Sequence, residues 1–307
     1  MQLKQIGKQY LAAKHNPHPL FCQETTKLKR EQIMYWVLIA IPVVFIVVFM
    51  VYPAILSVSY SFSHPEGGAF PNTLAYEQNF ADPEFFKSIE YNLLLVAVTV
   101  PLELLVGIFM ALILSRRFIG RGLLRAVMIL PITIPEVVFL VSMNTMFREK
   151  GVINSMLFYF GLPHENLWLV HSPFNFIIIV LVEIWRTTPI CALLILAGIQ
   201  SIPAQVYESA SIDRATTWMK FRHITLPLLK PAIVATILLR GIDAFKIFAT
   251  PYTLSPSIPT MTGYAYSIYY ERLQMSLVGL TRAAVSADIL ALFIVIFSYA
   301  FVRYTSR

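Results

Sequence analysis

Charged residues are scarce in this sequence, and the short motifs of common enzyme chemistry are missing from it. Only 13% of the 307 residues are charged, whereas a soluble domain carries about 25%. The phosphate-binding pattern GxxxxGK[ST], the zinc-protease pattern HExxH and the nucleophile pattern GxSxG are all absent. The sequence therefore argues against a soluble enzyme, and any ATP chemistry would have to come from another chain.

Cysteine is also rare. Cys22 and Cys191 are the two cysteines, and neither lies in a CxxC or CxxH pattern. This excludes a disulfide framework and a cysteine-rich zinc site, and we expect no metal site. We also expect no cleavable signal peptide, because residues 1–32 are polar and basic and contain no apolar run.

Long apolar runs are what the sequence has in abundance. The hydrophobic fraction is 57% and the mean hydropathy is +0.66. Several runs approach the roughly 20 residues that cross a bilayer as a helix. They predict an all-α transmembrane protein with six spans, at about residues 35–58, 91–115, 123–147, 174–200, 228–249 and 283–302. In the third of these, Pro131 and Pro135 predict a kink.

Lysine and arginine are unevenly distributed between the two sets of loops. They gather in the N-terminal tail, the 115–125 turn, the 207–231 stretch and the C-terminus, whereas the opposite loops contain few. Cytoplasmic loops carry the excess of such residues. We therefore expect a multi-pass protein of the cell membrane with both termini in the cytoplasm, and the net charge of +7 then reflects topology rather than binding of nucleic acid.

The stretch YESASIDRATTWMKFRHITLPLLKP, from Tyr207 to Pro231, interrupts the apolar pattern between spans four and five. Its first part predicts one short helix. A second is predicted over Thr216–His223, ending before Pro227. Two short helices on the cytoplasmic side could form a knob that docks in a partner's groove. The alternative from composition alone is an interfacial helix that only connects two spans.

The same stretch resembles the signature of membrane subunits of binding-protein-dependent ATP-driven importers, above all sugar-type members. That signature reads Glu-Ala-Ala-x-x-Asp-Gly-Ala and continues as Phe-x-x-Ile-x-Leu-Pro-x-x-x-Pro. LPITIP at Leu130–Pro135 and the run ILAGIQSIPAQVYESA are also similar to the family. By this resemblance, the residues that couple to the ATPase are Tyr207, Glu208, Ser209, Ala210, Asp213, Arg214, Ala215 and Phe221.

The resemblance implies a six-helix importer permease fold with a coupling segment at 201–227, within a permease domain at 33–307 that follows a basic tail at 1–32. It implies two ATP-binding subunits that hold ATP and magnesium, a second permease subunit and an external solute-binding protein. EIWRTTP and the run LKPAIV to AFKIF look most like trehalose- and maltose-type subunits. Substrate contacts are implied at Asn144, Phe147, Glu183, Trp185, Arg186 and Thr187.

Two positions depart from the family pattern. Arg214 stands where the family has glycine, so a residue with a Cβ atom must make the turn between the two short helices. The loop after span five reads TLSPSIPTMTG, where many sugar-type relatives have Thr-x-Gly-Gly-Pro. The first departure concerns the knob, and the second concerns the docking of a substrate-delivery protein.

Ionisable residues inside the predicted spans allow two interpretations. Each is costly near the bilayer centre, so each should face the bundle interior, a cavity or an interface. They could be neutralising pairs that hold helices together, or the polar lining of a solute path. These residues are Glu103, Glu136, Glu183, Arg186, Arg240, Asp243, Lys246 and Asp288.

Other functions stay open at this point. Glu183 or Asp243 could be the proton or cation site of a transporter driven by an ion gradient, in which case the knob would be only a linker. An importer subunit could also carry glycerol phosphate or an oligosaccharide instead of a disaccharide.

Overall fold

The computed structural model describes residues 34–64, 70–116, 118–163 and 166–305. Every regular element in these ranges is a helix and none is a strand, which confirms the all-α class. The chain divides into two compact units, Met1–Ser57 and Val58–Arg307. The basic tail predicted for residues 1–32 lies outside the described residues.

The described part of the first unit is one apolar helix. A continuous helix runs from Met34 to Ser61 over 28 residues, which is long enough to cross a bilayer. It contains the π-helical turn η1 (Val47–Val51) and continues as α3 (Tyr52–Ser61). Its apolar side chains from Met34 to Ile55 are exposed, as expected for a helix whose surroundings are lipid or a partner.

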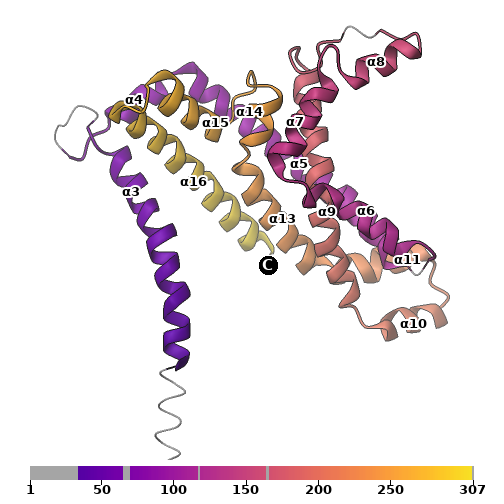
Figure 1. Ribbon diagram of the computed structural model, residues 1–307. Helices are drawn as coiled ribbons and strands as arrows, with labels where there is room; N and C mark the ends of the chain where they lie inside the picture. Colours follow the sequence, from indigo (N-terminus) through magenta and orange to yellow (C-terminus); the bar gives the residue numbers. More distant parts are fainter. Residues whose placement is uncertain (1–33, 65–69, 117, 164–165, 306–307) are drawn as a thin grey trace, which may run out of the picture. The chain divides into compact units, whose positions relative to one another are not determined.

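Three long helices of the second unit are each able to span a membrane. They are α5 (Pro83–Ser115), α9 (Phe174–Gln200) and α16 (Leu277–Thr305) (Figure 1). The Asp82 carboxylate accepts a hydrogen bond from the Glu84 amide and caps α5, while Pro83 occupies its first turn, where no intrahelical donor is needed. The most extensive helix–helix contact in the described chain joins α5 to α9.

The third predicted span is broken rather than kinked. The helix α6 (Arg121–Thr133) meets the run Glu136–Tyr159 at an angle of 94°. That run consists of α7 (Glu136–Phe147) and, beyond a short turn, α8 (Val152–Tyr159). Pro135 disfavours helical backbone at the preceding residue, and Ile134 is extended, with φ −80° and ψ 130°. Pro131 lies inside α6. The expectation of one kinked helix over 123–147 is therefore corrected.

A second bend lies at the start of the fifth predicted span. The short helix α10 (Ala204–Ile212) is followed by α11 (Thr217–Lys220), the π-helical turn η2 (Phe221–Thr225) and α12 (Leu226–Leu228). The part of this run from Thr217 to Leu228 meets α13 (Lys230–Phe245) at 62°. The prediction that helical structure stops before Pro227 is wrong, because Pro227 lies in the first turn of α12, where a missing amide is tolerated.

Several short elements lie at the end of the second unit remote from α10, and a polar network joins three of them to α16. There lie α4 (Leu74–Phe80), α14 (Ala249–Leu254), α15 (Met261–Tyr266) and the π-helical turn η3 (Ser267–Arg272) (Figure 1). Tyr264 Oη and Arg282 Nη2 donate to Asp82 Oδ2 over 2.9 and 3.1 Å. Burial, together with that hydrogen bond, raises the pKa of Tyr264, so the phenol remains a donor.

Candidate functional site

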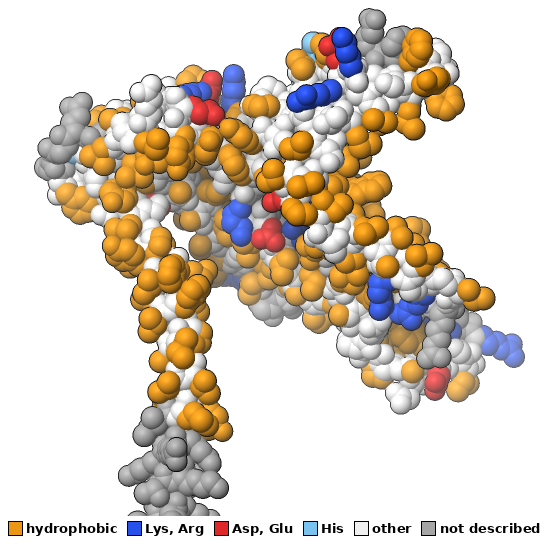
Figure 2. Space-filling model, in the orientation of Figure 1, with side chains coloured by type: hydrophobic (Ala, Val, Ile, Leu, Met, Phe, Trp, Pro, Cys, Tyr) orange, Lys and Arg blue, Asp and Glu red, His pale blue; other side chains and the backbone are white. Residues whose placement is uncertain are grey.

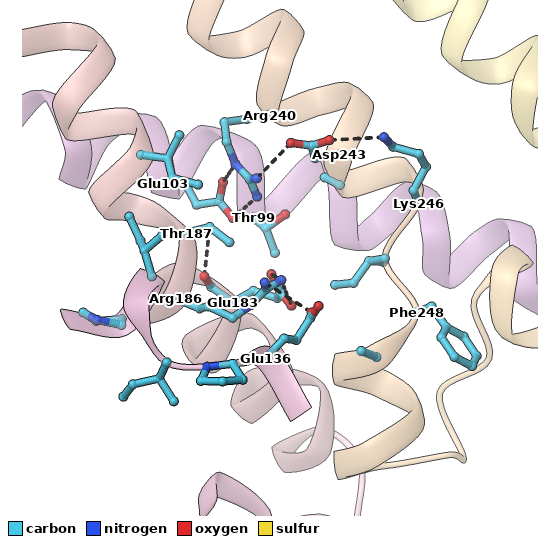
Figure 3. Close-up of a pocket in the computed structure, with 18 of the residues that line it drawn as sticks. Thr99, Glu103, Glu136, Glu183, Arg186, Thr187, Arg240, Asp243, Lys246 and Phe248 are labelled. Carbon is cyan, nitrogen blue, oxygen red and sulfur yellow. Dashed lines mark hydrogen bonds and ion pairs between the residues drawn. The ribbon is translucent and has the colours of Figure 1, made fainter. Parts of the chain in front are cut away.

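A cavity of about 700 Å³ lies among the helices of the second unit (Figure 3). Its walls come from α5, the α6–α7 break, α9 and the last turn of α13 with the segment after it. This volume is within the range of small-molecule sites. Because irregular backbone at membrane depth is tolerated only where it lines a cavity or is buried in protein, the break at Ile134 and Pro135 is consistent with its place in the wall.

One side of the cavity holds a buried ion pair. Arg240 Nε on α13 donates to Glu103 Oε2 on α5 over 2.9 Å, and both side chains are almost fully buried. Arg240 also lies 3.5 Å from Asp243, which in turn pairs with Lys246 at 3.2 Å. The chain of alternating charge runs from the buried interior to half-exposed Lys246 (Figure 3).

Arg186 on α9 forms the other charged centre. Its guanidinium lies 3.0 Å from Glu183 on the same helix and 3.2 Å from Glu136 in the first turn of α7. Thr250 Oγ1 donates a further hydrogen bond to Glu183. Within the described residues, Arg186 Nε is buried without a hydrogen-bond partner. The Arg186 guanidinium thus links α9 to the break in span three, and its Nε donor makes no hydrogen bond within the described residues.

The surface around this site is mostly apolar. Figure 2 shows side chains of both charges together in the middle of the face with hydrophobic side chains around them, and further charged groups toward its upper and lower ends. The cavity combines carboxylate acceptors, guanidinium and hydroxyl donors and the ring of Phe248. Such a mixture suits a hydroxylated solute, because each hydroxyl can donate and accept while a ring covers an apolar patch.

Three of the six predicted substrate contacts meet at this cavity. Glu183, Arg186 and Thr187 line it. Asn144 and Phe147 line a separate cavity of about 300 Å³ between the end of α7 and residues 167–170, and Asn144 donates to the Thr253 carbonyl over 2.8 Å. Trp185 is 67% exposed and lines neither cavity.

Several lining residues were not predicted as contacts. Thr99, Phe248 and the charged residues of α5, α7 and α13 belong to the lining but not to the set implied by the family motif. The sequence did contain a feature that could have identified most of them, namely the eight ionisable residues inside apolar runs. Seven of those eight line the cavity, and Asp288 does not.

The predicted coupling residues lie mainly on α10 and the turn that ends it. Glu208, Ser209, Asp213 and Arg214 are exposed. Arg214 has φ 54°, so the position of the family's glycine does require left-handed backbone. The remaining predicted residues in this segment, which are partly buried, are Tyr207, Ala210, Ala215 and Phe221.

The end of α10 is a Schellman motif. The Ala215 amide donates to the Ala210 carbonyl over 2.9 Å and the Arg214 amide donates to the Ser211 carbonyl over 3.1 Å. Tyr207 Oη and Thr225 Oγ1 lie 3.0 Å apart and tie α10 to η2. The segment is thus a folded projection at the end of α9 and not an extended linker.

Comparison with known proteins decides the family. Residues 103–307 match the family described as the binding-protein-dependent transport system inner membrane component. The chain belongs to this family. The match contains every wall of the cavity except Thr99, together with the whole 201–227 segment. The protein is therefore a membrane-embedded transport permease that works with a binding protein, and not an enzyme.

Several similar permeases are named for what they transport. The chain is 34% identical to the trehalose/maltose transport system permease protein MalF of Thermococcus litoralis over 241 residues, which cover 76% of this chain and 81% of the relative. It is 31% identical to the sulfoquinovosyl glycerol transport system permease protein SmoG of Agrobacterium fabrum, with 80% and 79% covered.

A solved structure shares the permease fold. A chain from the crystal structure of a bacterial ABC transporter that imports the acidic polysaccharide alginate superposes with a TM-score of 0.75. The sequence identity is 23%, and the alignment covers 92% of this chain and 99% of that one. The importer permease fold expected from the sequence is thereby confirmed.

Proposed function

We propose that the permease forms half of the translocation path for a disaccharide of the trehalose or maltose type, delivered by an external binding protein. The observation that carries this proposal is the cavity between α5, α9 and α13, which offers closely spaced donors and acceptors inside an apolar bundle. Similarity to a trehalose/maltose permease supports the substrate class.

Arg186, Glu183 and Thr187 are the proposed sugar contacts. Arg186 lines the cavity with a quarter of its side chain exposed, so its guanidinium can donate to a substrate hydroxyl. Half-exposed Glu136 can accept from the same sugar on the far side of the guanidinium. Asn144, Phe147 and Trp185 stay predictions, and Trp185 would have to act from the exposed surface.

Energy would come from two cytoplasmic ATPase subunits that bind ATP and magnesium and contact the 201–227 segment. Glu208 and Asp213 are exposed and take part in none of the ion pairs of the described chain, so they are free to meet a basic partner surface. A second permease subunit would supply the other half of the path, and both termini of this chain would lie in the cytoplasm.

The proposal is tested by ATP-dependent uptake into proteoliposomes that contain the complete complex and its binding protein. Trehalose, maltose, lactose and glycerol phosphate are compared as substrates. Glu136→Gln removes a charged acceptor at the cavity, and we expect it to raise KM for the preferred sugar about fivefold, the equivalent of roughly 1 kcal/mol. Glu90→Gln, an exposed change on α5 outside the cavity, is the matched control.

Two results would contradict the proposal. Uptake that ignores ATP and collapses with an uncoupler would indicate an ion-driven transporter. Uptake of glycerol phosphate in preference to every sugar would retain the importer and overturn the substrate class.

A further inference from the structure

A continuous series of aromatic rings leads away from the central cavity. The rings of Phe248 and Tyr252 are stacked, with centroids 5.0 Å apart. Tyr266 lies 5.3 Å from both of them, and Tyr270 lies 4.9 Å beyond Tyr266. The four rings come from three neighbouring elements. Phe248 immediately precedes α14 and Tyr252 lies within it, whereas Tyr266 ends α15 and Tyr270 lies in the π-helical turn η3. Turns of this kind occur often at functional sites.

The first two rings of the series, Phe248 and Tyr252, line a second cavity of about 540 Å³ at the α14–α15 end of the unit. Phe248 lines both this cavity and the central one, so the two cavities share this ring. Polar groups surround the aromatic wall. They belong to Glu84, Thr260, Ser267, Glu271 and Arg272.

The two outer tyrosine rings of the series are exposed and are not buried in the core. Tyr252 is 42% exposed and Tyr270 is 49% exposed, whereas Tyr264 in the same segment is buried. Tyrosines also gather at membrane interfaces, but an interfacial belt does not require its rings to touch or to end at a polar cavity. Here the rings are in mutual contact and reach the wall of a charged cavity.

The chemistry of this arrangement fits a carbohydrate. Aromatic faces carry negative charge density and attract the weakly positive C–H groups on the flat side of a sugar ring. Carboxylates, hydroxyls and a guanidinium beside them can pair with the sugar hydroxyls. Steps of about 5 Å between rings let one glycosyl unit leave a ring as the next unit arrives.

We propose that Phe248, Tyr252, Tyr266 and Tyr270 form an access track that binds successive glycosyl units and guides them from the exposed Tyr270 end, past the second cavity and Phe248, into the central cavity. The ligand class rests on the proposed function. The track itself rests on the ring contacts and on the two cavities that share Phe248.

The test compares Tyr252→Leu and Tyr266→Leu with wild type in the reconstituted complex. Leucine keeps apolar volume and removes the ring. We expect KM for uptake to rise about two- to tenfold, with kcat at saturating sugar unchanged and the increase larger for maltotetraose than for maltose. Tyr159→Leu on α8, which changes a tyrosine that is 87% exposed away from both cavities, is the control.

The outcomes separate the track from the transport function. If wild type takes up sugar and the two variants match it at every chain length, the track is overturned and the disaccharide path stands. A fall in kcat together with lost binding of the delivery protein would also overturn it, because it would place the tyrosines in a docking surface. If wild type takes up none of the sugars, both proposals fail.

Discussion

Glu103 is fully buried, and its carboxylate meets the guanidinium of Arg240 on another helix. Two charges taken from water into this environment cost several kcal/mol each, and their attraction roughly offsets that cost when the geometry is good. The pair therefore adds little net stability compared with apolar residues, whereas a single unpaired member would be strongly destabilising.

This asymmetry gives a prediction about stability. Glu103→Gln should lower the free energy of unfolding by about 3–5 kcal/mol, because Arg240 keeps its charge and retains only the longer, half-exposed ion pair with Asp243. The double change Glu103→Leu with Arg240→Met should recover most of that loss. Thermal unfolding of the purified permease in detergent measures both variants.

Asp243→Asn is the matched control for the pair. Asp243 is 46% exposed, so its removal should change stability by less than about 1 kcal/mol. A double variant no more stable than Glu103→Gln would contradict the argument and would show that the ion pair itself stabilises the bundle.

The end of α10 shows how a single element tolerates an unusual residue. Its Schellman motif places Arg214 in left-handed backbone, which costs an L-residue about 1–2 kcal/mol. Glycine would avoid that cost but would lose about 0.5–1 kcal/mol more backbone entropy on folding. The difference is small, which explains how the turn forms without the family's glycine.

We predict opposite effects for two substitutions at this turn. Arg214→Gly should slow hydrogen exchange of the amides at residues 213–216 slightly, by about twofold, the equivalent of roughly 0.5 kcal/mol. Arg214→Val should speed it by at least several-fold, because a β-branched residue is a marked outlier at positive φ. Hydrogen exchange with mass spectrometry provides the measurement, and equal exchange in both variants would show that the turn carries no strain.

The long helices were predictable from sequence because uninterrupted apolar runs in lipid have no alternative to helix. The break at Ile134 was not predictable from sequence. Pro131 and Pro135 lie four residues apart, yet Pro131 lies inside α6 and only Pro135 lies at a helix boundary. Whether Glu183 and Trp185 face a cavity or the surface depends on which neighbour covers each face of α9. Periodicity within α9 alone cannot supply that information.

Considered as a whole, the second unit provides charged groups for a path but encloses them only in part. Lys246 and Asp243 are about half exposed, and Glu136 is similarly open. Charges of this kind are costly against lipid, so their exposure supports the proposed second permease subunit on that side. The 201–227 segment lies at the other end of α9 and α13, where motion of a docked partner would be transmitted to both helices.

A charge reversal tests this transmission. Glu208→Lys should abolish substrate-stimulated ATP hydrolysis by the reconstituted complex, because Glu208 is exposed on α10, where the ATPase is proposed to dock. Binding of the delivery protein should be unchanged, because that protein is proposed to bind the outer loops. Steady-state ATPase rates and co-sedimentation of the binding protein provide the readouts. Glu90→Lys serves as a control, and loss of delivery-protein binding with intact ATPase stimulation would contradict the assignment.

The broken third span also bears on how the chain enters the membrane. The helices α6 and α7 have 13 and 12 residues, so each is about 20 Å long and shorter than the roughly 30 Å hydrocarbon layer. The cation that meets Glu136 lies on α9, which is synthesised later. Residues 121–147 are therefore expected to remain at the translocation channel until α9 emerges. Membrane insertion of this crossing would then be cooperative, because it depends on the later arrival of Arg186.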